Sequence, residues 1–205
     1  RDINAPDIVA GNDATITVTV PGDVEGVVLF DVDGKQLYAN IENGAAVLTL
    51  SGLDIGNHTV SYIYEGDDKS LPDGGEAKFE VSANDTYKII AESGAIQVGD
   101  NATVTVLLPE DAVGIVFVTV NDTVYSGDVS KGQAVITVPG LAEGSYDAEV
   151  YYTGDDKYAP GNTTVGITVD KVPNVPMNIT ADPVEADENP VIIVELPEDA
   201  TGNVT

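Results

Sequence analysis

The feature that most constrains this chain is a repeat with a period of 88 residues. Pro21, Pro109 and Pro197 are evenly spaced, since 109 minus 21 and 197 minus 109 both equal 88. Laying residues 8–81 over residues 96–169 needs no gap and leaves 25 of 74 positions identical. A gapless period of this length is typical of a folding unit that was duplicated whole.

The repeat divides the chain into three units. They are residues 1–81 (unit 1), residues 87–169 (unit 2) and residues 177–205 (unit 3), which holds only the N-terminal part of a further copy. The connectors, 82–86 and 170–176, are short and are not Gly/Ser tethers. Pro173 and Pro176 stiffen the second connector, so we expect a semi-rigid rod. Both ends of the chain are expected to be cut points, with unit 3 truncated or completed by something else.

Each unit shows the pattern of an all-β fold. Apolar Ala14, Ile16, Val18 and Val20 alternate with threonines, a period of two that predicts a strand with one buried face. Further strands are expected at 26–32, 36–39, 45–50, 58–64 and 77–81, with a leading strand near Ile8. About seven short strands in one repeat are typical of an Ig-like β-sandwich. The predicted fold class is therefore all-β, with tandem Ig-like β-sandwich domains.

Composition excludes several classes of partner. The chain carries 35 Asp and Glu against 8 Lys and Arg, a formal net charge of −27. Nucleic acid requires clustered positive charge, so it is excluded, and anionic membrane surfaces are disfavoured for the same reason. The sequence has no run of about 18 apolar residues, so no membrane insertion is expected in this segment. Cysteine is absent, so disulfides cannot hold the fold together.

An ordered set of motifs recurs in both complete units. Unit 1 has Asp33-Gly34, Asn43-Gly44, Leu53 with Gly56, and Tyr64 with Gly66-Asp67; unit 2 has Lys131-Gly132, Leu141 with Gly144 and Tyr146, and Tyr152 with the run 154–158. This pattern resembles the group 3 bacterial Ig-like repeat over both units. The resemblance implies a tandem array in a bacterial surface protein or an adhesin-like protein of methanogenic archaea.

One position differs between the units in a chemically informative way. Leu141, Gly144 and Tyr146 match a tyrosine corner, in which a Tyr at the start of a late strand hydrogen-bonds back to the preceding connection. His58, the only histidine, occupies the place of Tyr146 in unit 1. A lone imidazole without recurring partners favours a structural role over a metal or catalytic one.

Seven Asn-x-Thr sequons suggest that the protein lies outside the cell. Random placement of Asn and Thr would give about two such acceptors. The acceptors are Asn57, Asn84, Asn101, Asn121, Asn162, Asn178 and Asn203. The alternative is that Asn and Thr meet often because both are common in turns and strands. We expect some of these residues to be glycosylated, and therefore an extracellular, cell-surface location.

An acidic loop supplies the candidate metal ligands. Asp67 and Asp68 recur one period later as Asp155 and Asp156, and paired carboxylates can contribute to a Ca²⁺ site. Calcium takes six to eight oxygen ligands, and Gly-Asp is also a good turn, so turn formation is the default interpretation. No other cofactor is predicted.

The sequence shows no nucleophile with a base and no long loop that would build a pocket, so we do not expect an enzyme. The leading hypothesis is a structural stalk or fibre module of a large repetitive adhesin-like protein. Its partners would be neighbouring repeats of the same chain and, in a fibre, other copies. The alternative is an adhesin module that contacts a glycan or protein of a host or partner cell through exposed residues such as Tyr151 and Tyr158.

Overall fold

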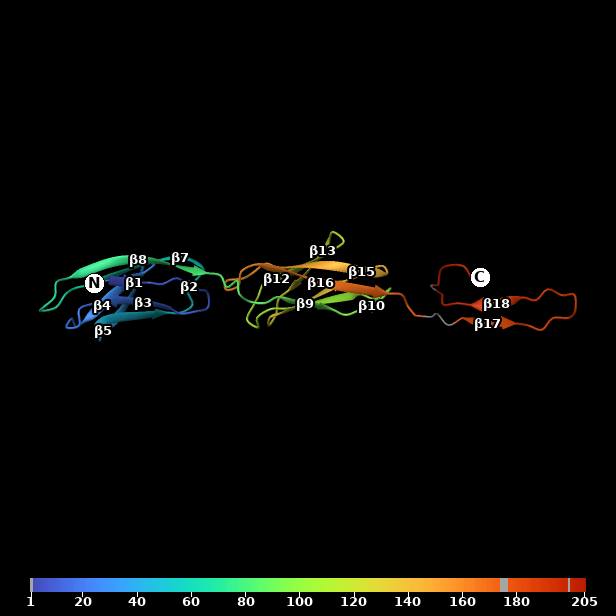
Figure 1. The fold of residues 1–205 in the computed structure, drawn as a ribbon, viewed down its shortest axis with the longest axis horizontal. Helices are drawn as coiled ribbons and strands as arrows, with labels where there is room; N and C mark the ends of the chain where they lie inside the picture. The colour runs from blue at the N-terminus through green and yellow to red at the C-terminus, as the bar shows by residue number, and fades with distance from the viewer. Residues whose placement is uncertain (1, 174–176, 199) are drawn as a thin grey trace.

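All the regular structure in the described residues is β-strand, as the alternating pattern predicts. The computed structural model describes residues 2–173, 177–198 and 200–205. Units 1 and 2 follow one another along the long axis of the molecule (Figure 1). The all-β, Ig-like fold class is therefore confirmed. In the part of the chain that the structure describes, no helix has the length and apolarity needed to span a bilayer.

Unit 1 is a two-layered sandwich. Its strands are β1 (Asp2–Asn4), β2 (Ile8–Val9), β3 (Ala14–Thr19), β4 (Val27–Val32), β5 (Lys35–Glu42), β6 (Ala45–Leu50), β7 (Gly56–Tyr64) and β8 (Asp73–Ser82). They pair in the order β1-β3-β6-β5-β4-β7-β8-β2. The strand expected near Ile8 is only two residues long and pairs parallel with β8, whereas β1, which the pattern did not predict, pairs antiparallel with β3. The N-terminal segment thus contributes to both layers.

Unit 2 repeats this arrangement. Its strands are β9 (Ile90–Ser93), β10 (Ile96–Gln97), β11 (Ala102–Leu107), β12 (Ile115–Val120), β13 (Thr123–Asp128), β14 (Gln133–Val138), β15 (Gly144–Tyr152) and β16 (Gly161–Asp170). They form a three-stranded sheet, β14-β11-β9, and a five-stranded sheet, β10-β16-β15-β12-β13. The layers stay separate because β13 ends at Asp128, whereas β5 continues to Glu42 and pairs with β6.

The described part of unit 3 is a hairpin. β17 (Asn178–Ala181) pairs antiparallel with β18 (Ile192–Glu195), with Asn178 opposite Glu195. Ile179 and Ile192 are both 64% exposed, so this hairpin buries little apolar surface. Two strands alone are marginal in water, because they cannot close a core.

Each complete unit has its own hydrophobic core, built from the predicted alternating residues. In unit 1, Ile16, Val18 and Phe30 are completely buried with Tyr64. In unit 2, Val104, Ile136, Ile167 and Tyr152 fill the equivalent space. Burying each such side chain stabilises the fold by about 1.5–3 kcal/mol, which is the main source of stability in a chain without disulfides.

Gly132 is required by the turn before β14. Its backbone has φ of 69°, and an added Cβ would lie 2.8 Å from the carbonyl oxygen of Leu108 and closer still to that of Pro109. Both the backbone conformation and the close approach therefore demand glycine.

Substituting Gly132→Ala is expected to destabilise unit 2 by about 2 kcal/mol or more, since it combines a left-handed backbone with a steric clash. Gly166→Ala is the matched control, because nothing lies within 4 Å of its added Cβ. Urea unfolding followed by circular dichroism measures both variants. Equal stabilities would show that the turn tolerates a side chain.

Candidate functional site at the junction of the units

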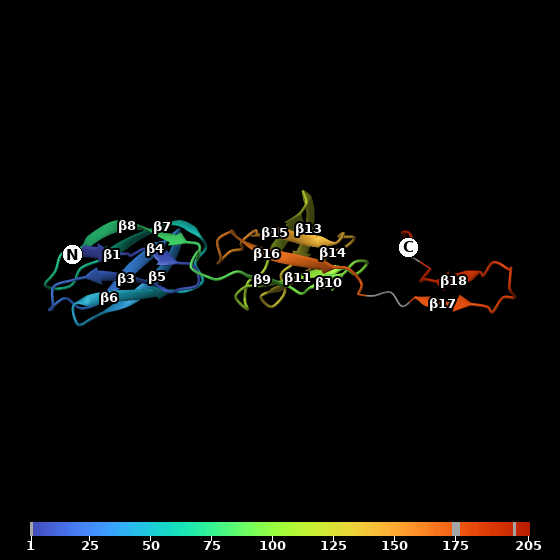
Figure 2. The same cartoon turned by 45° about the vertical axis from the view of Figure 1, so that its right-hand side comes forward.

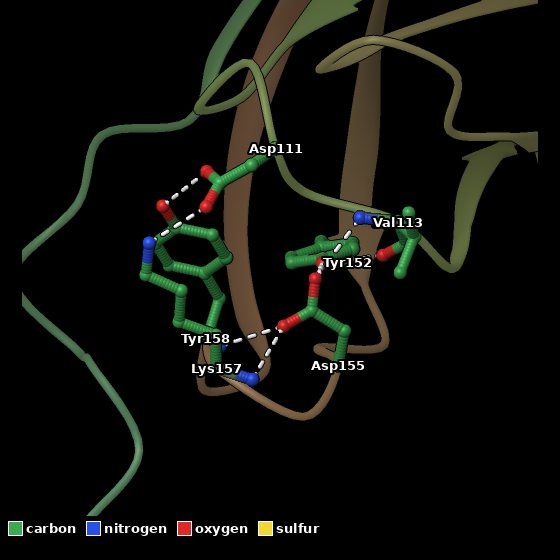
Figure 3. A network of polar contacts seen from close by, with 6 residues as sticks. All are labelled: Asp111, Val113, Tyr152, Asp155, Lys157 and Tyr158. Carbon is green, nitrogen blue, oxygen red and sulfur yellow. Dashed lines mark hydrogen bonds and ion pairs between the residues drawn. The ribbon is translucent and has the colours of Figure 1, made fainter. Parts of the chain in front are cut away.

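Asp155 organises the acidic loop of unit 2 (Figure 3). One carboxylate oxygen accepts backbone N–H bonds from Lys157 (2.8 Å) and Tyr158 (2.7 Å). The other oxygen accepts the N–H of Val113 (2.9 Å) and the hydroxyl of Tyr152 (3.0 Å). Tyr152, which is completely buried, also donates to the carbonyl of Val113 at 2.5 Å. The loop is therefore tied to the core and to the β11–β12 connection.

The same network occurs one period earlier. Asp67 accepts the N–H groups of Lys69 (2.8 Å) and Ser70 (2.6 Å), and more distantly that of Glu25 (3.4 Å). Tyr64 donates to the carbonyl of Glu25 at 3.1 Å. The backbone hydrogen bond from Lys69 is the largest of the influences that lower the pKa of Asp67 to about 2. The ionised carboxylate is thus the form that the turn stabilises.

Unit 2 adds a feature that unit 1 lacks. Asp111 accepts the hydroxyl of Tyr158 (2.6 Å) and pairs with the ammonium of Lys157 (2.6 Å), as Figure 3 shows. The Lys157 hydrogen bond is the main cause that lowers the pKa of Asp111 and, reciprocally, Asp111 raises that of Lys157. Unit 1 has Ser70 in the place of Tyr158, so the tyrosine contact cannot form there.

The first connector packs onto this network. The N–H of Asn84 donates to the carbonyl of Lys157 (2.8 Å), and the N–H of Ala159 donates to the carbonyl of Asn84 (2.9 Å). Tyr87, the first residue after the connector, has its ring edge-on to those of Tyr152 and Tyr158, with centroids 6.1 Å and 5.2 Å apart, and its hydroxyl donates to the carbonyl of Ala159. The connector is therefore part of the unit 2 sandwich.

Unit 1 reaches the same place through the turn between β2 and β3. A Cβ added to Gly11 would lie 2.5 Å from the Cε atom of Lys157, so the Gly11 backbone lies directly against this side chain. Lys157 thus joins the acidic loop of unit 2 to the end of unit 1. We name the assembly of Asp111, Asp155, Lys157, Tyr158 and Tyr87 the junction network.

The geometry gives the predicted calcium ligands another task. All the contacts of Asp155 described above come from N–H or O–H donors, while Asp68 and Asp156 are exposed. Among the residues that the structure describes, no group of three or more His, Cys, Asp or Glu is placed to hold a metal ion. Calcium binding stays a prediction, and Asp67 and Asp155 are explained by the turns.

His58 takes over the tyrosine corner in unit 1. Its Nε2 lies 2.7 Å from the carbonyl of Asp54, four residues earlier, just as the Tyr146 hydroxyl donates to the carbonyl of Ala142 at 2.9 Å. Its Nδ1 lies 2.6 Å from the carboxylate of Asp33, and the ring stacks on Phe79. Two acceptors on two ring nitrogens favour the imidazolium, so the Asp54 hydrogen bond and then that of Asp33 raise the pKa of His58.

The predicted sequons are accessible in most cases. Asn57, Asn101, Asn121, Asn162, Asn178 and Asn203 are exposed, whereas Asn84 is half-buried in the connector. Asn57, Asn162 and Asn178 lie within strands rather than turns. Their glycosylation stays a prediction.

Of the two tyrosines predicted as contact residues, only Tyr151 is exposed. Tyr158 is 6% exposed and belongs to the junction network, so its prediction as an exposed binding residue is wrong. Its ring packs against that of Tyr87, and its hydroxyl donates to Asp111. The roles of Asp111 and Tyr87 were not predicted from the sequence. The conservation of an Asp at both 23 and 111 was the available signal for the first.

Comparisons with known proteins bear on the fold. No family model and no curated protein matches the chain. Domains A168–A170 of titin align over 95% of this chain and 72% of their own, with 15% identity and a TM-score of 0.53. The adhesin InvE of Yersinia pseudotuberculosis (81% and 58% covered, 16% identity, TM-score 0.40) and fibronectin(III)-like modules of CbhA from Clostridium thermocellum (83% and 94%, 16%, 0.35) overlap less closely. The titin alignment supports tandem Ig-like domains, while the group 3 assignment stays a prediction.

Replacing Asp155 with Ala is expected to destabilise unit 2 by about 1–3 kcal/mol, because the N–H groups of Val113, Lys157 and Tyr158 lose the carboxylate that accepts their hydrogen bonds. Asp156→Ala, the exposed neighbour, should stay within about 0.5 kcal/mol of the wild type. Urea unfolding with and without a calcium chelator measures both. Equal losses for both variants that vanish in chelator would instead establish a calcium site.

The loss of stability caused by Asp155→Ala is expected to depend on pH. Burial, the largest single influence on Asp155, raises its pKa, but the hydrogen bonds from Val113, Tyr158 and Lys157 outweigh it and the pKa lies below the ordinary 3.8. The stability that ionised Asp155 provides is therefore complete above pH 3.8 and is lost as the pH falls through the lower folded value. In that acid range the free energy of unfolding of Asp155→Ala should approach that of the wild type, because the wild type loses the contribution of its ionised carboxylate.

His58 is expected to titrate above its ordinary pKa of 6.5. The stability it gives unit 1 is complete below pH 6.5 and is lost as the pH rises through the higher folded value. Proton NMR reads this directly, because the chain has one histidine. In His58→Tyr, which copies unit 2, the alkaline loss of stability should disappear. An apparent pKa at or below 6.5 would contradict the two hydrogen bonds.

Proposed function

We propose that this chain is a semi-rigid spacer, a stalk or fibre module of a large, repetitive, adhesin-like cell-surface protein. The observation that carries the proposal is the junction network, in which the connector is hydrogen-bonded into unit 2 and Lys157 contacts the end of unit 1. A joint of this kind restricts rotation between neighbouring units, which a spacer requires and an independent binding module does not.

The direction of the chain supports a spacer. In units 1 and 2 the polypeptide enters toward one end of the sandwich and leaves toward the other, so the units follow in line in both views (Figures 1 and 2). Parallel pairing of β2 with β8 and of β10 with β16 is consistent with this path. Length therefore grows with each repeat added, on the order of 40 Å, from strands rising about 3.3 Å per residue plus loops.

The second connector is built differently. One period after Asn84 and Tyr87 the sequence has Val172 and Val175, so neither the Asn84 side chain nor the Tyr87 ring recurs. The two prolines predicted to stiffen this connector are Pro173 and Pro176, of which Pro176 lies outside the described residues. The second connector thus lacks the contribution that the Tyr87 ring makes to the junction network.

Charge and modification sites suit the outside of a cell. A net charge of −27 keeps long molecules soluble and apart through mutual repulsion. Six of the seven sequons are exposed, as acceptors of N-linked sugar must be. The absence of enzymatic activity stays a prediction. For the alternative of an adhesin module, Tyr151 is still available as an exposed contact residue, whereas Tyr158 is not.

The spacer is tested by the distance between the units. Val47 and Val135 are exposed, equivalent positions of units 1 and 2, and a chain without cysteine accepts spin labels only where Cys is introduced. Double electron–electron resonance on Val47→Cys/Val135→Cys should give a narrow distance distribution. Adding Tyr87→Ser should broaden the distance distribution at least about twofold, because the chain next to the connector loses the ring that packs against Tyr152 and Tyr158.

Tyr125→Ser is the matched control, since Tyr125 also packs against the core of unit 2 but lies on β13, away from the connector. It should leave the distribution narrow. A broad distribution in the parent chain would overturn the semi-rigid spacer. A narrow one that Tyr87→Ser leaves unchanged would show that the junction network does not set the geometry.

A further inference from the structure

An aromatic row crosses the outer face of the five-stranded sheet of unit 2. Phe117 on β12 pairs with Tyr151 on β15, and Tyr151 pairs with Asn162 on β16. All three residues lie at outward positions, where Tyr151 is 45% exposed and Phe117 is half-buried. Directly opposed residues on adjacent strands have Cβ atoms about 5 Å apart, so Asn162 lies beside the Tyr151 ring.

The surface beside this row is hollowed. A shallow depression is lined by Thr119, Glu149, Tyr151, Asn162 and Thr164. The walls are hydroxyls and a carboxylate, which hydrogen-bond to sugar hydroxyls, and the ring of Tyr151 lies among them. The depression thus combines an apolar ring face with polar groups, which suits a pyranose, whose two faces carry C–H groups and whose edge carries hydroxyls.

Asn162 is itself a sugar acceptor by sequence, because it begins the sequon Asn162-Thr163-Thr164. In the transfer, its Nδ2 attacks the anomeric carbon of a lipid diphosphate-linked oligosaccharide. The N–C bond forms as the C–O bond to the diphosphate breaks, the lipid diphosphate leaves, and the amide proton passes to a base of the transferase. The first sugar is then held one bond from Asn162.

The other strand sequons lack this environment. Asn57 pairs with Glu80 and Asn178 pairs with Glu195, so a carboxylate rather than an aromatic ring lies opposite each of them. Unit 1 has Gly74 and Ile63 at the places of Asn162 and Tyr151, so it has neither the acceptor nor this ring. Acceptor and aromatic face occur together on this sheet only in unit 2 among the two complete units.

We propose that Asn162 carries an N-linked glycan whose first sugar packs on the ring of Tyr151 and covers the aromatic row. The idea rests on the extracellular location in the proposed function, but not on the spacer role. A sugar held in this way would shield the aromatic row on the outer face of the five-stranded sheet of unit 2 from solvent. It would also restrict the motion of β15 and β16.

The test is the reactivity of tyrosine rings toward tetranitromethane. The full chain is produced in two forms, secreted from a eukaryotic host that performs N-glycosylation and made in a bacterium that does not. Peptide mass spectrometry measures the occupancy of Asn162 and the nitration rate of each tyrosine. Tyr38 in unit 1 is the internal control, because it is 67% exposed and its cross-strand partner is Leu29 rather than a sequon residue.

We expect Asn162 to be occupied and nitration of Tyr151 to fall about fivefold in the glycosylated chain, while Tyr38 reacts equally in both forms. Asn162→Gln in the glycosylating host should restore the Tyr151 rate, and Asn57→Gln should not. An unmodified Asn162, or an occupied Asn162 with an unchanged Tyr151 rate, would overturn the proposal. Neither result affects the spin-label distances, so the spacer role is judged separately.

Discussion

Burial of alternate apolar side chains between two sheets is the constraint on which the rest of this structure depends. The chain has no cysteine, so each unit depends on packing rather than on disulfides. The core side chains are at most 1% exposed in Ile16, Phe30, Ile136 and Ile167. Large-to-small changes at such sites cost about 2–5 kcal/mol, a large part of a domain's stability. The loops and connectors keep their geometry because these cores fix the strand ends.

In the junction network, one turn stabilises its own loop and also contributes to the contact between units. Asp155 closes its own loop through two N–H bonds and holds Val113 and Tyr152 through its other oxygen. The turn in unit 1 does the same with Asp67, so this function belongs to the repeat. Tyr158 and Asp111 then add a surface on which the chain around the connector packs, and unit 1, with Ser70 in the place of Tyr158, lacks the aromatic part of this surface. A local motif thereby becomes an interdomain contact.

Much of the fold was readable from the pattern, and the errors have identifiable causes. Strands 45–50 and 58–64 were found almost to the residue as β6 and β7, because one face of each is buried and period two is strict there. β1 was missed because three residues carry no legible period. Tyr158 was wrongly predicted to be exposed, because the local sequence of a loop does not show where a tyrosine side chain points. Its hydroxyl donates to Asp111, which is distant in the sequence.

The sequence by itself determined the repeat, the all-β class and the tyrosine corner, since each is written in local spacing: 88 residues, alternate positions, and Tyr146 two residues after Gly144. Only the tertiary structure decided that Asp111 meets Lys157, that Gly11 lies against that side chain, and that Asn162 stands beside Tyr151. These contacts join residues 11 to 146 positions apart, and strand register and domain packing, not composition, set such distances.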